Sequence, residues 1–139
     1  MSLLALLDHT LLGAASRVAL DADDADDTTR SFTFGELESR SNRWAQVLHA
    51  RGIRRGDRLA FLLPNCVEII DLWLACVKLG VIVVPVNVLY QSREIAHIIG
   101  DAEPVAVVTT AERVGDLPTG VPAWLAGDLV REASALEHL

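Results

Sequence analysis

The densest group of potential metal ligands is an acidic run, Asp21–Asp27, in which five of seven residues are aspartates. A calcium loop of the EF-hand type needs ligands at alternating positions, a glycine at the sixth position and a glutamate at the twelfth. Counted from Asp24, these two positions hold Thr29 and Gly35, and counting from Asp21 fails in the same way. We therefore interpret the run as the solvated tip of a hairpin.

The cysteines and histidines do not form a recognisable site either. Cys66 and Cys76 lie ten residues apart in an apolar segment, which matches neither a metal-binding spacing nor a disulfide framework. We interpret them as buried free thiols in a reducing cytoplasm. The histidines have no carboxylate or cysteine partner at ligand spacing, and we interpret each as a surface or packing residue: His9, His49, His97 and His138.

Phosphate-binding and nucleophile motifs are missing from the sequence. The nine glycines, at positions 13, 35, 52, 56, 80, 100, 115, 120 and 127, form neither G-x-G-x-x-G nor G-x-x-x-x-G-K-[ST]. No serine lies in a G-x-S-x-G turn. The residues alone therefore predict no catalytic, cofactor-binding or metal-binding residue in this chain.

Length and charge narrow the class of protein. The chain of 139 residues is a natural length for one domain, so we expect residues 1–139 to form a single domain. Its net charge of −7 argues against binding of nucleic acid or an anionic membrane surface. The longest charge-free run, Leu79–Ser92, contains Pro85 and is shorter than the roughly 20 apolar residues of a transmembrane helix. Because Asp8 follows the start closely and no basic region precedes it, we expect no signal peptide and a cytoplasmic protein.

The first third of the chain predicts a helix, a hairpin and a second helix. Residues 3–12 suggest a short amphipathic helix that stops at Gly13, and strands are expected at 18–20 and 31–34. Thr33 and Glu36 have capping-box spacing, with Phe32 and Leu37 at the staple positions. The helix that begins there carries an apolar stripe and ends at a glycine, so its stripe residues are expected in the core: Leu37, Trp44 and Leu48, with Gly52 as the C-terminal cap.

The middle of the chain predicts a strand over 58–63, stopped by Pro64, and then a helix over 66–79. Asn65, with Glu68 three residues later, is expected to cap this helix. Apolar residues surround the helix except for one narrow polar stripe, so we expect it to be nearly engulfed, with Trp73 as part of its packing. The stripe consists of Glu68, Asp71 and Lys78.

Two later segments are apolar without alternation, as strands buried on both faces are. We expect Val81–Val84 and Val105–Val108 to be central or near-central parallel strands. Ser92 is expected to cap the helix between them and Gly100 to close it, with Ile95, Ile98 and Ile99 on one face. A further strand in "VPAWLA" and a terminal helix follow. This alternation predicts an α/β fold: a three-layer α/β/α domain with a doubly wound, mostly parallel sheet, an N-terminal helix and a hairpin.

The same motifs, taken in register, resemble the N-terminal portion of adenylate-forming (AMP-binding) enzymes over about residues 31–110. The resemblance rests on Thr33-Phe34-Gly35-Glu36-Leu37, on Gly56-Asp57 before a strand, on Pro64-Asn65 after it, and on Lys78-Leu79-Gly80 before an apolar strand that ends at Pro85. Because Pro85 is followed by Val86-Asn87, the chain is most similar to acyl-CoA synthetases.

The resemblance implies a parent enzyme that uses ATP, Mg²⁺ and CoA. In that family a carboxylate attacks the α-phosphate of ATP to give an acyl-adenylate, and a thiol then takes the acyl group. The family's phosphate loop, T-S-G-T-T-G-x-P-K, does not occur here, and neither do the Tyr-Gly-x-Thr-Glu segment and the C-terminal catalytic lysine. The matching positions are therefore scaffold, and no catalytic residue or bound cofactor is expected in this chain.

Two function classes remain open from the sequence. The first is the inactive scaffold fragment of an acyl-CoA synthetase, whose exposed apolar surface is covered by the remainder of the parent enzyme or by self-association. The second is a stand-alone, non-catalytic α/β binding or interaction module. The hydrophobic fraction of 51% favours the first, because large apolar patches are uncommon on monomers.

Overall fold

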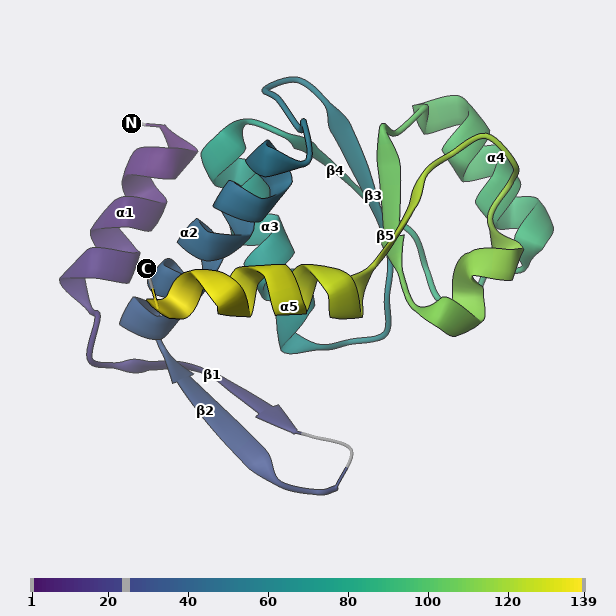
Figure 1. Ribbon diagram of the computed structural model, residues 1–139. Helices are drawn as coiled ribbons and strands as arrows, with labels where there is room; N and C mark the ends of the chain where they lie inside the picture. The colour runs from purple at the N-terminus through teal and green to yellow at the C-terminus, as the bar shows by residue number, and fades with distance from the viewer. Residues whose placement is uncertain (1, 24–25, 139) are drawn as a thin grey trace.

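The computed structural model describes residues 2–23 and 26–138. A four-stranded parallel sheet lies between two layers of helix, and the N-terminal helix and a β-hairpin lie to one side (Figure 1). The helices are α1 (Leu3–Gly13), α2 (Phe34–Ala50), α3 (Val67–Leu79), α4 (Ser92–Ala102) and α5 (Ala126–Ala135), with short 3-10 helices η1 (Ala111–Asp116) and η2 (Leu136–His138). The strands are β1 (Val18–Asp23), β2 (Thr29–Thr33), β3 (Arg58–Leu62), β4 (Ile82–Pro85), β5 (Ala106–Thr109) and β6 (Ala123–Leu125).

The sheet is doubly wound, as the sequence predicted. Its strand order is β4-β3-β5-β6, and all neighbouring pairs are parallel. Helix α3 connects β3 to β4 on the face that α2 and α5 also cover, and α4 connects β4 to β5 on the opposite face (Figure 1). The crossover from β3 to β4 and the crossover from β4 back past β3 to β5 run in opposite directions across the sheet, which places helices on both faces.

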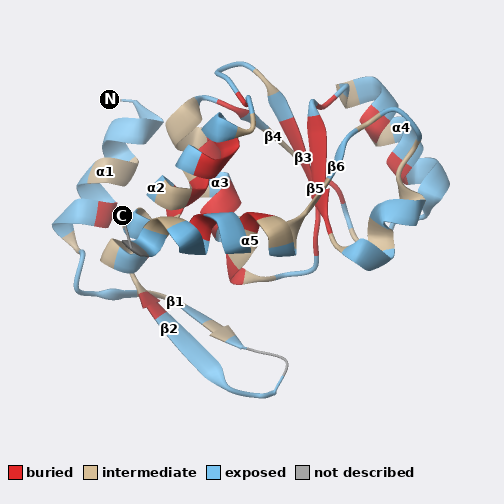
Figure 2. Cartoon of the chain, in the orientation of Figure 1, coloured by how far each residue is buried: buried red, intermediate tan, exposed pale blue. Residues whose placement is uncertain are grey.

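The main core fills the space between the sheet and helices α2, α3 and α5, and a second cluster lies under α4. Trp44 is only 2% exposed, and Leu37 and Leu48 are also buried, which confirms the predicted apolar stripe of α2. Ile95 and Ile99 of α4, predicted to share one face of their helix, are buried on the other face of the sheet. Figure 2 shows the same pattern, with β3 and β5 buried along most of their length.

The hairpin forms as predicted, but its strands reach further into the acidic run. β1 and β2 pair antiparallel up to Asp23 opposite Thr29, and Ser31 Oγ donates to Asp21 Oδ1 at 2.6 Å. The centre of the run, Asp24 and Ala25, lies outside the described residues. The acidic segment is therefore partly strand, because hydroxyl groups on β2 are within hydrogen-bonding reach of the β1 carboxylates.

Helix starts agree with the predictions to within one residue. Thr33 caps α2, and its Oγ1 accepts from the Glu36 N–H at 3.1 Å. The prediction of Asn65 as the cap of α3 is wrong, because α3 begins one residue later with Cys66 at the N-cap. For α4, Gln91 rather than Ser92 is the N-cap, and the Glu94 side chain accepts from its N–H.

Helix ends depend on residues that reach the left-handed region of backbone space. Gly52, at φ +94°, follows the last residues of α2, and Gly80, at φ +71°, ends α3. A Cβ atom at Gly80 would also lie 2.9 Å from the Arg55 Cγ atom, so only glycine fits there without rearrangement. The predicted stop at Gly100 is wrong, because α4 continues to Ala102 and ends at Glu103, at φ +48°.

The polar stripe of α3 faces α2 rather than solvent. Asp71 is fully buried and accepts from Arg40 Nε at 3.0 Å and from Arg40 Nη2 at 2.6 Å. Lys78 Nζ lies 2.8 Å from Glu38 Oε2 and donates to Ser41 Oγ at 2.7 Å. Because these groups satisfy one another, the charged side of α3 is the side that packs against α2.

The opposite side of α3 is therefore less buried than the sequence predicted. Trp73 is 44% exposed, so its assignment to the helix packing is wrong. The placement of β4 as a central strand is also wrong, because β4 is an edge strand whose Ile82 is 50% exposed. β5 is central and fully buried, as predicted. An unbroken apolar strand at an open edge indicates surface that another layer of protein can cover.

The Arg40–Asp71 pair is expected to contribute strongly to stability. Arg40→Ala leaves a fully buried carboxylate without its main partner, so we expect a loss of about 3 kcal/mol in the free energy of unfolding. Arg131→Ala, which removes a highly exposed ion pair with Asp128, is the control and should cost at most about 0.5 kcal/mol. Equal losses for the two variants in urea unfolding would contradict this assignment.

The same pair predicts a dependence on pH. Burial raises the pKa of Asp71 above its ordinary value of 3.8, and Arg40 offsets part of that increase. In Arg40→Ala the pKa of this carboxyl rises further, so the folded state binds a proton that the unfolded state has released. The stability deficit of Arg40→Ala should therefore be smaller near pH ~4 than near pH ~7, as measured by unfolding at both values. A deficit that grows toward acid would contradict this sign.

Candidate functional site

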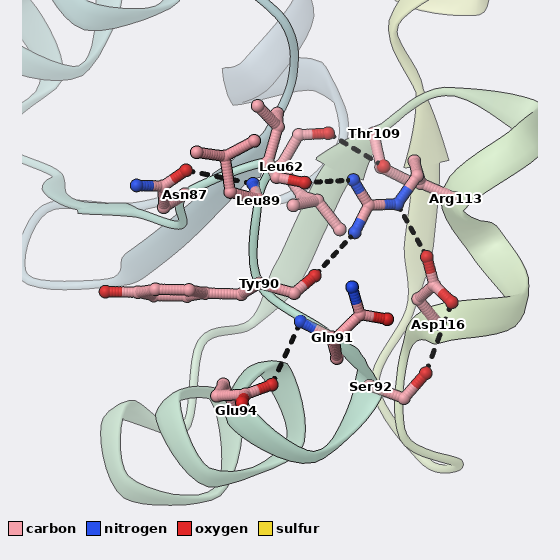
Figure 3. A network of polar contacts seen from close by, with 11 residues as sticks. Leu62, Asn87, Leu89, Tyr90, Gln91, Ser92, Glu94, Thr109, Arg113 and Asp116 are labelled. Carbon is pink, nitrogen blue, oxygen red and sulfur yellow. Dashed lines mark hydrogen bonds and ion pairs between the residues drawn. The ribbon is translucent and has the colours of Figure 1, made fainter.

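The carboxyl ends of the parallel strands form one edge of the sheet, where doubly wound folds ordinarily receive ligands. At the switch point between β3 and β5 this edge is closed. Leu62 and Thr109 are fully buried there, and Thr109 Oγ1 donates to the Leu62 carbonyl at 2.8 Å (Figure 3). Open space lies instead one strand further along, at the ends of β3 and β4.

This space, which we call the edge groove, has a volume of about 510 Å³. It runs between the carboxyl ends of β3 and β4, the outer side of α3, and the start of the connection to α4. Its lining contains apolar and aromatic side chains and two amides, without a single aspartate, glutamate, lysine, arginine or histidine. The lining residues are Phe61, Leu63, Asn65, Ile69, Trp73, Pro85, Val86, Asn87, Val88, Tyr90 and Ile98.

One wall of the edge groove is a loop, residues 87–91, that is held from behind by Arg113 (Figure 3). Arg113 Nη1 donates to the Val88 carbonyl at 2.7 Å, and Nη2 donates to the Tyr90 carbonyl at 3.0 Å. Within the loop, the Leu89 N–H donates to Asn87 Oδ1 at 2.9 Å. The Tyr90 ring points away from the guanidinium group in Figure 3, so the clamp fixes the backbone and leaves the ring on the groove side.

Asp116 orients the guanidinium group of Arg113. Its Oδ2 atom accepts from Arg113 Nε at 2.5 Å, and its Oδ1 atom accepts from Ser92 Oγ at 3.2 Å. These hydrogen bonds, chiefly the one from Arg113, lower the pKa of Asp116 below its ordinary value. The clamp thus joins η1, the loop after β4 and the start of α4, and it fixes the shape of the groove wall.

The arrangement suits contact with apolar surface rather than acid–base or nucleophilic chemistry. Burial raises the pKa of the Cys66 thiol to about 11 and that of Cys76 to about 12, so both are neutral thiols at physiological pH. His9, His49 and His97 are exposed, as predicted, and the side chain of His138 lies outside the described residues. Within residues 2–23 and 26–138, no three histidine, cysteine or acidic side chains cluster as a metal site.

The edge groove does not fit a Mg²⁺-triphosphate either. Such a ligand needs cations or ordered N–H groups for its phosphates and carboxylates for its metal, and the lining provides neither type of charged side chain.

Across the described part of the chain, no helix has the length and apolar content needed to cross a membrane.

The motifs singled out in the sequence have structural roles. The Gly56 N–H donates to the Gly80 carbonyl at 2.9 Å, which joins the turns before β3 and β4. Asp57 Oδ2 accepts from the Arg54 N–H at 2.7 Å and stabilises the first of these turns. Lys78 binds α2, and Pro85 ends β4. These contacts give the matching residues structural roles within this chain.

Fold and groove together define a doubly wound α/β scaffold with an uncharged surface at the carboxyl edge of its sheet. The AMP-binding enzyme family matches residues 7–137, nearly the whole chain. The chain belongs to the AMP-binding enzyme family.

Individual relatives are acyl-CoA ligases. The chain is 35% identical, over 96 residues, to the crotonobetaine/carnitine–CoA ligase of Salmonella paratyphi A (strain ATCC 9150 / SARB42), covering 69% of this chain and 19% of that protein. It is 36% identical, over 109 residues, to the long-chain-fatty-acid–CoA ligase FadD13 of Mycobacterium tuberculosis (strain CDC 1551 / Oshkosh), covering 72% of this chain and 22% of that protein. The chain thus spans about a fifth of the length of the curated relatives it matches.

The fold is also similar to that of solved structures. NpsA-ThdA, an artificially fused adenylation–PCP di-domain from Klebsiella oxytoca, superposes with a TM-score of 0.85 at 24% identity, over 96% of this chain and 24% of that one. This likeness establishes the fold.

The clamp generates a prediction about the loop. Arg113→Ala removes charge-assisted hydrogen bonds to two carbonyls, so we expect a loss of about 2 kcal/mol in stability. It should also speed hydrogen exchange at the Leu89 and Tyr90 amides. Arg113→Lys keeps the charge but not the fork geometry, so its effect should be intermediate.

Arg93→Ala, at an exposed position on α4, is the matched control and should change stability by less than about 0.5 kcal/mol. If Arg113→Ala left exchange in the loop unchanged, the clamp would not hold the groove wall.

Proposed function

We propose that this chain is the scaffold part of the large N-terminal domain of an ATP-dependent acyl-CoA ligase. Such an enzyme joins a carboxylate to AMP with release of pyrophosphate, and the thiol of CoA then displaces AMP to give acyl-CoA. The observation that carries the proposal is the match of residues 7–137 to the AMP-binding enzyme family, together with acyl-CoA ligases among the relatives.

In this proposal residues 1–139 form a single domain that contributes shape and no reactive group. The parent protein would use ATP, Mg²⁺ and CoA, and the residues that bind them would lie outside this chain. Three observations support an inactive scaffold: the missing phosphate loop, the uncharged lining of the edge groove, and the neutral thiols.

The partner in this proposal is the remainder of the parent enzyme, and the compartment is the cytoplasm, where free thiols such as Cys66 and Cys76 persist. In the isolated chain, self-association can substitute for the missing partner because apolar side chains such as Trp73 and Leu89 are exposed.

The sequence of the gene downstream of Leu139 tests whether this chain is part of an acyl-CoA ligase: a phosphate loop rich in threonine and glycine, in frame, is expected. A stop codon would instead favour a stand-alone, non-catalytic α/β module.

The expected lack of MgATP binding can be measured directly. Titration of the purified chain with MgATP in a calorimeter should give no saturable heat, because the groups that neutralise a triphosphate are absent from the edge groove. A full-length crotonobetaine/carnitine–CoA ligase, titrated under the same conditions, is the positive control. Saturable micromolar binding by the isolated chain would overturn the scaffold assignment and indicate a nucleotide-binding module.

A further inference from the structure

We propose that the groove between the β1–β2 hairpin and the start of α3 binds an extended segment of another protein, which adds as a strand beside β1. The segment has alternating apolar and basic side chains. We call this space the hairpin groove, and its volume is about 650 Å³. It shares only Asn65 and Ile69 with the lining of the edge groove, and a peptide partner of this kind is separate from the proposed function in acyl-CoA formation.

Strand β1 has one edge that no other strand covers in the described part of the chain. The hairpin is a two-stranded sheet, in which β2 pairs with the other edge of β1. In an antiparallel pair, alternate residues turn their N–H and C=O groups away from the partner strand. Two of the four residues 20–23 therefore direct both backbone groups to the outer edge, where an added strand can pair with them.

The hairpin groove runs along this open edge. Its lining includes four consecutive residues of β1, which are Leu20, Asp21, Ala22 and Asp23. Because successive side chains of a strand point to opposite faces, a space that touches all four residues lies beside the strand rather than above one face. Residues 65–70, at the start of α3, form the opposite wall. The groove therefore has the arrangement that β-strand addition requires.

The side chains around the groove indicate the sequence of the peptide. Leu20 and Ala22 pack toward the core cluster that includes the start of α3, and Ile70, which is 37% exposed, borders the groove from the helix. Asp21 and Asp23 point to the opposite face of β1 and are exposed. Side chains that are opposite each other on paired strands interact directly. Apolar peptide side chains are therefore expected beside Leu20 and Ala22, and basic side chains beside the aspartates.

The charge of the lining favours a basic partner. Its carboxylates are Asp21, Asp23 and Glu68, and the cation among the lining residues is Arg30. The guanidinium carbon of Arg30 lies 5.3 Å from the centroid of the Phe32 ring, so this cation stacks on an aromatic ring of its own strand. The net charge of the whole chain, −7, has the same sign as that of the lining. Lysine and arginine are therefore attracted to the groove, and acidic segments are repelled.

A second copy of the chain is a poor occupant of this edge. If the β1 strands of two copies paired with each other, the aspartates of one copy would lie close to those of the other. Like charges on paired strands are destabilising, and charged edge strands protect proteins from edge-to-edge association. The same aspartates that oppose pairing between copies favour a strand of opposite charge.

The mixture of charged and apolar residues also separates the hairpin groove from the edge groove. Four of its eleven lining residues are charged, whereas none is charged in the edge groove. Permanent interfaces are more apolar and are depleted of charge at their centres, and transient interfaces are more polar. The hairpin extends away from the sheet and the helices (Figure 1). A separate protein that binds and dissociates therefore fits this groove better than a permanently attached domain.

The first measurement is a titration of the isotopically labelled 139-residue chain, at low concentration, with a capped peptide of alternating lysine and valine. NMR spectra should show saturable shifts at the amides of residues 20–23 and 65–70. Hydrogen exchange should slow at the β1 amides that face the open edge. Shifts confined to other parts of the chain, or no saturable shift, would overturn the proposal.

Two peptides of the same length are the controls for this titration. A peptide of alternating glutamate and valine reverses the charge and should not bind. The lysine–valine peptide with every backbone nitrogen methylated keeps the charge and the side chains but donates no backbone hydrogen bond, so it should not bind either. Equal binding of the methylated peptide would indicate simple electrostatic adsorption, and equal binding of the glutamate peptide would refute the charge preference.

The double variant Asp21→Asn, Asp23→Asn tests the role of the two charges. Asparagine keeps an oxygen that can accept the hydrogen bonds from Ser31 and Thr29, so the unfolding midpoint should not change. The affinity for the lysine–valine peptide should fall about tenfold, and binding to the original chain should weaken as salt is added. Asp101→Asn removes an exposed carboxylate on α4 and should leave the affinity unchanged. Equal affinities of the double variant and the original chain would contradict the assignment.

Other occupants of the groove would give different results. Slow exchange of the outward β1 amides in dilute chain without peptide would mean that the chain itself covers the edge, and the proposal would fail. Protection that appears only as the chain is concentrated would assign the edge to a second copy. A fusion of the full chain to the part of FadD13 that follows the region matched over 109 residues should bind the peptide equally well. Loss of binding in the folded fusion would overturn the assignment to a separate protein.

Discussion

The bidentate ion pair between Arg40 and Asp71 is the constraint on which the arrangement of the helices depends. A carboxylate with no exposed surface must be paired, and Arg40 of α2 provides both hydrogen bonds. This fixes the rotation of α3, because its polar stripe has to face α2. Lys78, further along the same stripe, is held by α2 in the same way.

The rotation of α3 decides which apolar residues remain outside. With Asp71 turned toward α2 and Leu72 toward the sheet, Ile69 and Trp73 are left beside the carboxyl ends of β3 and β4. The uncharged groove is thus a consequence of satisfying a buried charge elsewhere on the same helix.

A second polar network, made by Arg113 and Asp116, fixes the wall on the other side of the groove. Arg113 donates to the carbonyls of Tyr90 and Val88, which lie 23 and 25 positions earlier in the chain. Asp116 orients the Arg113 side chain. Both charged networks therefore support the groove from outside while contributing no charge to its lining. Polar groups that are fully paired in this way specify a unique arrangement of loops and helices.

The sequence by itself determined the order of helices and strands, the doubly wound sheet and the absence of the family's phosphate loop, because apolar periodicity and capping residues act locally. Two caps were misplaced by one residue, because the backbone of α3 becomes helical after Cys66 rather than after Asn65, and that of α4 after Gln91 rather than after Ser92. Only the tertiary structure decided that β4 lies at an edge, that Trp73 is exposed and that Arg113 clamps a distant loop. Each of these features depends on which elements become neighbours in space. The apolar sequence of β4 would be the same whether or not another strand of this chain lay beside it, so the sequence does not show that β4 is an edge strand.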